Sequence, residues 1–273
     1  MMPRPAAIGV NGLLFAASAI ALFPLLWMVS TSLMSPGESS AYPPLLVPQQ
    51  PTLDNYRELF ARAGMGRYLA NSLLLAVAVT ALSMFFNVMA GYAFAKLRFA
   101  GRERIFRLML GALVIPGQVA MVPLFLLLKH LGLVNSYGGI IVPALASIFG
   151  IFLVRQYALS IPDDLLEAAR IDGASEWRIY RSIVLPWCRP ILVTLGLFTF
   201  MGAWNDFLWP LVVLSDSDRY TLPVALAGLV GEHVQDTELM MAGAVLTVMP
   251  VVVLFLALQR FYIAGVMGGA IKE

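Results

Sequence analysis

Charge is scarce in this sequence. Asp, Glu, Lys and Arg make up 12% of its 273 residues, whereas hydrophobic residues make up 60%. A typical soluble domain carries about 25% charged residues. A water-soluble fold would have no place for so much apolar surface, so the composition excludes an ordinary soluble protein. It indicates a chain whose natural solvent is the lipid bilayer.

Residues that carry covalent, metal or nucleotide chemistry are equally few. The single cysteine, Cys188, cannot form an internal disulfide or a thiolate cluster. The two histidines, His130 and His233, lie far apart, with no Cys, Asp or Glu at ligand spacing. No phosphate-binding sequence Gly-x4-Gly-Lys-Ser/Thr occurs, and the basic residues form no continuous stripe. We therefore expect no metal site, no catalytic residue, no bound cofactor and no nucleic-acid partner in this chain.

Long uncharged runs are what the sequence does contain. Each run approaches or exceeds the ~20 residues that a helix needs to span about 30 Å of hydrocarbon. We predict an all-α membrane protein with a single transmembrane domain over 1–273. Its six predicted transmembrane helices cover about 10–31, 69–95, 107–129, 137–155, 190–214 and 239–260.

The basic residues predict the orientation of these helices. If both termini are cytoplasmic, the cytoplasmic segments hold thirteen Lys and Arg residues and the opposite side holds five. Cytoplasmic loops of membrane proteins carry an excess of Lys and Arg. The sequence therefore predicts a multi-pass protein with both termini in the cytoplasm.

A charged island, Glu167 to Pro186, separates the fourth and fifth predicted spans. Gly173 permits a sharp change of direction, Ser175 is a good cap for a following helix, and Pro186 is expected to end that helix. The pattern predicts a helix–turn–helix over about 160–189 that projects from the bilayer on the cytoplasmic side. Its first helix carries small residues, which allow another backbone to come close.

Polar side chains within the apolar runs are the second set of candidates. Asp206 is the only acidic residue deep in such a run, where an ionisable group is costly and is a functional candidate by default. It either lines the path of a solute or holds helices together, and both interpretations remain open. Trp204 and Asn205 are neighbours able to stack on or hydrogen-bond a polar solute. Gln118 and Asn87 are further candidates, although interhelical hydrogen bonding also accounts for them.

The charged island resembles the cytoplasmic coupling loop in the membrane subunits of bacterial ATP-driven (ABC) importers. The resemblance rests on the pattern Glu-Ala-Ala, three residues, Gly, nine residues, Ile, one residue, Leu-Pro. It implies that the segment contacts a separate ATPase. The residues assigned to this coupling role are Glu167, Ala168, Ala169, Asp172, Gly173, Ile183, Leu185 and Pro186.

Further segments are similar to the shorter permease subunit of carbohydrate ABC importers, the type represented by the maltose and glycerol-3-phosphate systems. The resemblance runs from about residue 10 to the C-terminus. The segments that carry it are Pro51–Tyr56, Asn71–Leu74, Gly91–Phe99, Ile115–Gln118, Ala203–Leu211, Tyr220–Pro223 and Gln259–Phe261.

This resemblance implies the type I ABC importer permease fold, in the bacterial cytoplasmic (inner) membrane, and an import function for a sugar or sugar-like solute. It also implies a second homologous permease, an ATPase dimer that binds ATP and Mg²⁺, and an extracytoplasmic solute-binding protein. The Gly-rich tail 265–273 is implied to be an extended segment that reaches the ATPase; a frayed end is the alternative.

Two other function classes compete with this interpretation. A secondary carrier that works without an ATPase would show an inverted repeat or paired broken helices. An intramembrane enzyme would need a nucleophile or a metal cluster. Neither signature is visible in the sequence, and co-purification with an ATPase would separate the importer from both.

Overall fold

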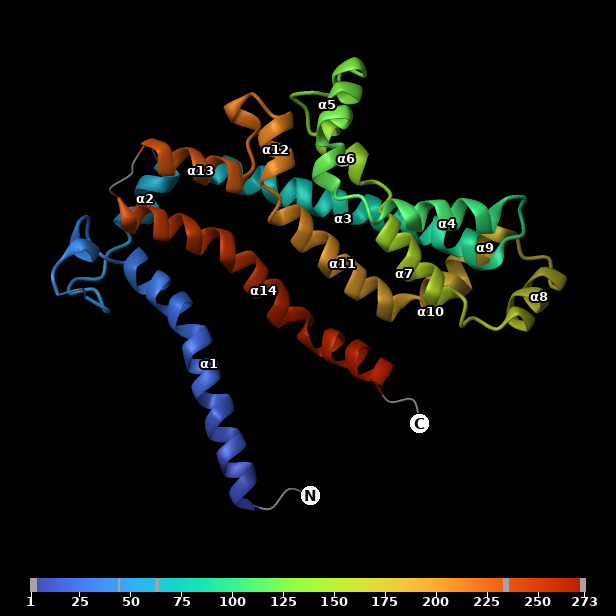
Figure 1. Ribbon diagram of the computed structural model, residues 1–273, viewed down its shortest axis with the longest axis horizontal. Coiled ribbons are helices and arrows are strands. Elements are labelled where there is room, and N and C mark those ends of the chain that lie inside the picture. Colours follow the sequence, from blue (N-terminus) through green and yellow to red (C-terminus); the bar gives the residue numbers. More distant parts are fainter. Residues whose placement is uncertain (1–3, 44, 62–63, 233–235, 271–273) are drawn as a thin grey trace. The chain divides into compact units, whose positions relative to one another are not determined.

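The computed structural model describes residues 4–43, 45–61, 64–232 and 236–270, and all regular structure in these residues is helical (Figure 1). The chain divides into two compact units. The first consists of Met1–Arg67 and Leu222–Val252, and the second of Tyr68–Thr221 and Val253–Glu273. The helices α3 (Met65–Lys96) and α14 (Thr237–Ala270) each run from one unit into the other.

Within the residues that the structure describes, four apolar stretches are long enough to cross a membrane. Two further pairs of helices meet the same requirement only when each bent pair is taken as one span, which gives six, the number predicted from the sequence. The all-α membrane fold is therefore confirmed. The four single spans are Gly9–Ser32, Met65–Lys96, Gly138–Ala158 and Thr237–Ala257.

The segment predicted as a continuous span over 107–129 is sharply bent. Its two parts, α4 (Arg102–Ala112) and the helical stretch Gly117–His130, meet at 98°. Pro116 lies at the break, where it supplies no N–H to continue a helix. The residues close to the break, 108–115 and 119–128, carry no charge on either side, so hydropathy did not reveal the bend.

The predicted span over 190–214 also differs from the structure. It consists of α11 (Arg189–Trp204) and the short α12 (Leu208–Val213), with a three-residue non-helical connection between them. At 1.5 Å per residue, the 16 residues of α11 are about 24 Å long. Asp206 lies in the connection and not in a helix, contrary to the continuous span expected from the apolar run.

In the first unit, buried polar contacts fix the end of α1 (Arg4–Ser32). Asn55 on α2 (Asp54–Ala61) is buried, and its Nδ2 donates to the carbonyl oxygens of Ser32 and Met34 at 2.9 and 2.8 Å. The Tyr56 and Ser32 hydroxyls share a further hydrogen bond of 2.8 Å. These bonds satisfy carbonyl groups that a helix terminus leaves free. The unit also contains η1 (Glu38–Ser40) and α13 (Leu222–Glu232).

In the second unit, α3 packs closely against α7 (Ile148–Ala158). A Cβ atom on Gly91 would lie 2.6 Å from Cγ1 of Val154, so only glycine allows this approach. Val88, Tyr92 and Val154 belong to one buried apolar cluster. The cluster extends beyond these two helices to residues 161–195, so it also anchors the charged island.

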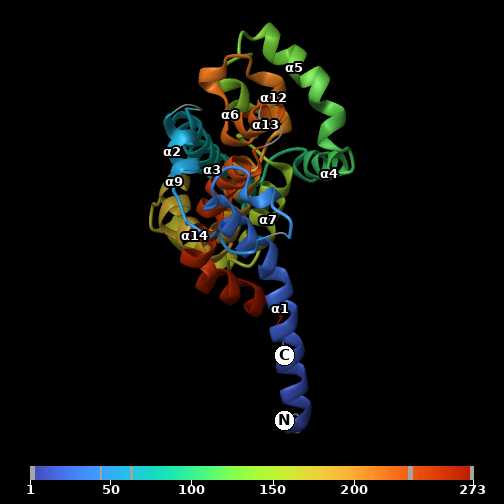
Figure 2. The same cartoon turned by 90° about the vertical axis from the view of Figure 1, so that its left-hand side faces the viewer.

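A second group of helices in this unit lies side by side in both views (Figure 2). Its members are α5 (Met121–His130), α6 (Gly138–Ala144) and α12, which contacts both of the others around the buried residues Leu128, Ile140 and Val213. The remaining elements of the unit are η2 (Gly117–Ala120), α8 (Asp163–Ile171), α9 (Glu176–Ile179), η3 (Tyr180–Val184), α10 (Leu185–Trp187) and η4 (Ser217–Arg219).

The backbone of the Gly-rich tail is helical as far as Ala270. This differs from the extended segment expected over 265–273, of which residues 271–273 lie outside the described part. Propagation adds one hydrogen bond per residue to a helix that already exists. The long helix that precedes the tail therefore offsets the cost of about 1 kcal/mol per glycine. A short isolated helix of the same sequence would not offset it.

Candidate functional site

The charged island forms a helix–turn–helix, here called the elbow, made of α8, a turn and α9 (Asp163–Ile179). Gly173 lies in the turn with φ at +78°, a left-handed conformation that favours glycine. Its N–H donates to the carbonyl of Arg170 at 3.0 Å. The hydroxyl of Ser175 accepts a hydrogen bond from the backbone N–H of Arg178 at 3.3 Å and caps α9. The turn at Gly173 and the Ser175 cap are both confirmed.

The chain leaves the elbow through one wide turn of π-helix, η3, which continues into α10. Pro186 lies inside α10, so the expectation that it ends the helix was wrong. Proline is tolerated near the start of a helical segment because its missing N–H has no partner there. The change of direction, 79°, comes two residues later, at Cys188.

Lys96, at the end of α3, holds the start of the elbow. Its side chain is 7% exposed, and its Nζ donates to the carbonyl of Ile161 at 2.6 Å and to Oδ1 of Asp163 at 2.7 Å. This bond holds the pKa of the Asp163 carboxyl below its ordinary value. Because folding lowers that pKa, the contact stabilises the fold above the ordinary Asp range and is lost as the pH falls through the lowered value.

A second contact from α3 holds the far helix of the elbow. The Tyr92 hydroxyl donates to Oε2 of Glu176 at 2.7 Å, while Nε of Arg170 donates to Oε1 of the same carboxylate at 2.8 Å. One carboxylate thereby joins α3, α8 and α9. Figure 1 shows the elbow at the C-terminal end of α3, where these contacts lie.

The predicted coupling residues divide into an exposed set and a packed set. Ala169, Ile183 and Leu185 are half-buried against the apolar cluster and position the elbow. The other coupling residues face solvent. Their apolar neighbour Ile171 is 86% exposed, although the sequence analysis did not single it out. The exposed members of the predicted set are Glu167, Ala168, Asp172, Gly173 and Pro186.

A cavity of about 650 Å³ lies within the second unit. Asp206 and Gln118 both line it, so the structure brings together two residues that are far apart in sequence. Oδ1 of Asp206 accepts a hydrogen bond from the backbone N–H of Trp209 at 3.3 Å. The wall of the cavity comes from α3, the η2–α5 stretch, α6, the start of α7, α11 and α12.

The other three predicted solute-path residues are not part of this wall. Trp204 is 1% exposed, and its ring stacks on Phe200 with centroids 6.0 Å apart. Asn205 is exposed and donates to the carbonyl of Met201, in the last turn of the helix that it follows. Asn87 is fully buried between α3 and the start of α7, which agrees with the interhelical role named as its alternative.

Several polar and aromatic residues of the wall were missed by the sequence analysis. The indole of Trp209 lines the cavity, and its Nε1 donates to the carbonyl of Gly139 at 3.1 Å, which fixes the ring. Thr221 also lines the cavity, and its buried hydroxyl has no hydrogen-bond partner in the described part of the chain. The signal was weak because each of these residues is ordinary in an apolar run. The remaining polar residues of the wall are Ser83, Ser147 and Thr199.

Comparison with known proteins gives this geometry its context. Residues 83–267 match the family described as "Binding-protein-dependent transport system inner membrane component". The chain is 40% identical over 260 residues to the arabinooligosaccharides transport system permease protein AraQ of Halalkalibacterium halodurans, with 93% of this chain and 92% of that protein covered. It is 34% identical to the diacetylchitobiose uptake system permease protein NgcG of Streptomyces coelicolor, with coverage of 98% and 90%.

The fold has a counterpart among solved structures. A crystal structure of a bacterial ABC transporter involved in the import of the acidic polysaccharide alginate contains a chain that superimposes with a TM-score of 0.85. The match covers 95% of this chain and 97% of that one, at 24% sequence identity. The chain belongs to the binding-protein-dependent transport system inner membrane components, and it is a non-catalytic, multi-pass permease subunit of an ABC importer.

Proposed function

We propose that this subunit forms one half of a pore that imports a neutral oligosaccharide, and that the elbow docks on a separate ATPase. A second homologous permease, an ATPase dimer that binds ATP and Mg²⁺, and an extracytoplasmic solute-binding protein complete the assembly. The relatives named for arabinooligosaccharides and diacetylchitobiose support a sugar as the solute.

The observation that carries the ATPase contact is the firm attachment of an exposed tip. Lys96 and Tyr92 hold the base of the elbow to α3, while Glu167 and the largely exposed Ile171 face outward. A single apolar side chain this exposed, next to small and charged residues, suits the polar-rimmed contact of a protein interface. Because the base of the elbow is bonded to α3, a displacement of the tip by a partner would also move α3.

The cavity supports a neutral solute. Among the described residues that line it, Asp206 is the only charged one, and there is no lysine or arginine to pair with an anion. A carboxylate accepts hydrogen bonds from sugar hydroxyls, and the unpartnered hydroxyl of Thr221 offers another polar contact. Trp209 adds the aromatic surface typical of a small-molecule site.

Reconstitution with the partner subunits tests this function. The expected result is ATP-dependent uptake of a neutral oligosaccharide delivered by the binding protein, with no comparable uptake of an acidic one. Uptake without ATPase subunits would favour the secondary carrier. Equal uptake of acidic and neutral oligosaccharides would remove the cavity charge as a determinant of solute class.

Replacing Asp206 by asparagine is expected to lower uptake about fivefold while the yield of assembled complex stays near that of the wild type. Asparagine keeps the acceptor for the N–H of Trp209 but removes the charge, and hydrogen bonds to charged groups exceed neutral ones by about 1 kcal/mol. Uptake and complex yield are measured together, with Asn205→Ala as the control. Loss of the complex in Asp206→Asn would assign the carboxylate to helix packing.

Reporter fusions test the proposed orientation. A reporter that is active only in the cytoplasm should be active when fused after Arg102 or after Ser175, and inactive when fused near Gln49. The reason is the excess of Lys and Arg on the side assigned to the cytoplasm. An active cytoplasmic reporter at Gln49 would reverse the orientation of every span.

A further inference from the structure

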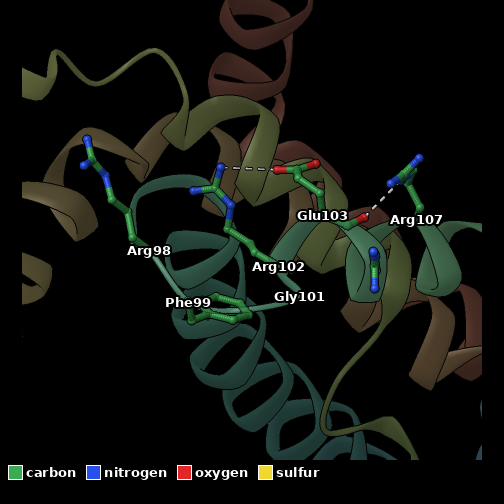
Figure 3. A pocket seen from close by; sticks show the side chains of 7 residues that line it. Arg98, Phe99, Gly101, Arg102, Glu103 and Arg107 are labelled. Carbon is green, nitrogen blue, oxygen red and sulfur yellow. Dashed lines mark hydrogen bonds and ion pairs between the residues drawn. The ribbon is translucent and has the colours of Figure 1, made fainter.

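The turn between α3 and α4 contains a basic cavity of about 660 Å³ (Figure 3), which shares Arg98 and Arg102 with a neighbouring cavity that reaches the elbow. Four of the seven residues that line it are arginines, against a single acidic residue. The lining residues are Arg98, Phe99, Gly101, Arg102, Glu103, Arg104 and Arg107.

The one carboxylate of this cavity is already engaged. Oε1 of Glu103 accepts from Arg155 at 3.1 Å and lies 3.3 Å from the guanidinium of Arg102. Arg98 and Arg104 are exposed and make no hydrogen bond or ion pair with the residues that the structure describes. Figure 3 shows Arg98 apart from Arg102 and Arg107, which contact the carboxylate and the backbone carbonyl of Glu103. Its lining therefore carries four guanidinium groups against one carboxylate, which leaves a net positive charge.

The backbone adds to this potential. Gly101, with φ at +83°, precedes the 11-residue helix α4, whose N-terminus receives no side-chain cap within the described residues. The N-terminus of a helix carries a partial positive charge and free N–H groups, both of which favour an anion. Two arginines are held in place, since Arg102 donates to the carbonyl of Leu97 at 3.1 Å and Arg107 to that of Glu103 at 3.3 Å.

The location of the cavity identifies the kind of anion. Arg98 follows the apolar span Met65–Lys96 by two residues, which is the depth of lipid headgroups at the end of a span. Apolar side chains adjoin the arginines: Phe99 is 41% exposed, Ile105 44% and Leu108 75%. A soluble anion would make no favourable contact with these apolar side chains, whereas a phospholipid presents acyl chains next to its phosphate.

We propose that the turn between α3 and α4 is a binding site for an anionic phospholipid, whose phosphodiester contacts Arg98, Arg102, Arg104 and Arg107. Arginine binds phosphate oxygens with paired N–H groups in a fixed geometry. The apolar side chains of Phe99, Ile105 and Leu108 contact the first part of the acyl chains. The site lies on the segment that joins the helix holding the elbow to the sharply bent span, so lipid occupancy steadies that joint.

Native mass spectrometry of the full chain, purified in a neutral detergent and titrated with phosphatidylglycerol, tests the site. The variant Arg98→Gln/Arg104→Gln removes the two arginines that hold no internal bond, so the fold is not expected to suffer. Its affinity for phosphatidylglycerol should fall roughly tenfold or more. Arg178→Gln/Arg181→Gln, which removes the same charge from exposed positions on the chain's other basic segment, is the matched control and should bind like the wild type.

Four outcomes would overturn the assignment. One is unchanged phosphatidylglycerol binding by Arg98→Gln/Arg104→Gln, and another is equal loss in the control variant. The third is displacement of the lipid by millimolar inorganic phosphate, which would make the cavity a site for a soluble anion. Equal affinity of the wild type for phosphatidylcholine would likewise remove the role of charge. If the ATPase is the occupant, Arg98→Gln/Arg104→Gln loses ATPase co-purification in lipid-free detergent and keeps its lipid affinity.

Discussion

A complex that carries Gly173→Trp is expected to take up no measurable solute, although the subunit inserts and folds. At Gly173 no atom lies within 4 Å of the position a Cβ would occupy, so the fold has room for a side chain. The left-handed φ costs a non-glycine residue about 1–2 kcal/mol. The indole would stand on the proposed docking surface, where loss of about 2 kcal/mol weakens binding about 30-fold.

The control for this variant is Gly173→Ala, which carries the same backbone strain without the bulk. It should retain most of the uptake and of the ATPase co-purification. Uptake in proteoliposomes and recovery of the ATPase with the tagged subunit are the two measurements. Normal uptake by Gly173→Trp would show that the elbow does not transmit the action of the ATPase.

The second large effect is expected for Lys96→Met, which should uncouple ATP hydrolysis from transport and lower thermal stability. The ammonium group is nearly buried and donates to the carbonyl of Ile161, which would be left without this donor. Hydrogen bonds to charged groups contribute about 1.5–3 kcal/mol, so the free energy of unfolding should fall by about 2 kcal/mol. ATPase activity of the complex should persist while uptake falls.

Lys129→Met is the matched control, because Lys129 is exposed and its side chain makes no hydrogen bond to the residues that the structure describes. It should match the wild type in both uptake and thermal stability. The anchoring role would be contradicted if the Lys96→Met complex took up solute at the wild-type rate and hydrolysed the same amount of ATP per molecule of solute as the wild type. Lys96→Arg is a further test, since arginine keeps the positive charge of the wild-type side chain but has a different shape.

The elbow was predictable because its determinants are local. Gly173 supplies the turn, Ser175 supplies the cap, and both lie next to the helices that they shape. The attachment of the elbow to α3 was not predictable. Tyr92 and Lys96 lie 84 and 67 positions before their partner carboxylates, and nothing in either segment alone indicates which carboxylate each will contact.

The cavity could be predicted only in part. Asp206 and Gln118 were found because polar residues are conspicuous in apolar runs, and the structure places both in one wall. Asn205 and Trp204 were included because they adjoin Asp206, but the helix ends there and the three side chains have different surroundings. Hydropathy measures composition and does not detect where an apolar run stops being helical.

The position of the elbow's anchors on α3 has a mechanical consequence. Tyr92 and Lys96 are one helical turn apart at one end of α3, and Leu75, Val79 and Ser83 on the same helix line the cavity. Lys96 and Leu75 are 21 residues apart, which is about 32 Å along a helix. If α3 moves as a rigid rod, a tilt of about 10° at the elbow displaces the wall at Leu75 by about 5 Å. For a given tilt, the displacement of the cavity wall therefore grows with the length of helix between the elbow contacts and the cavity.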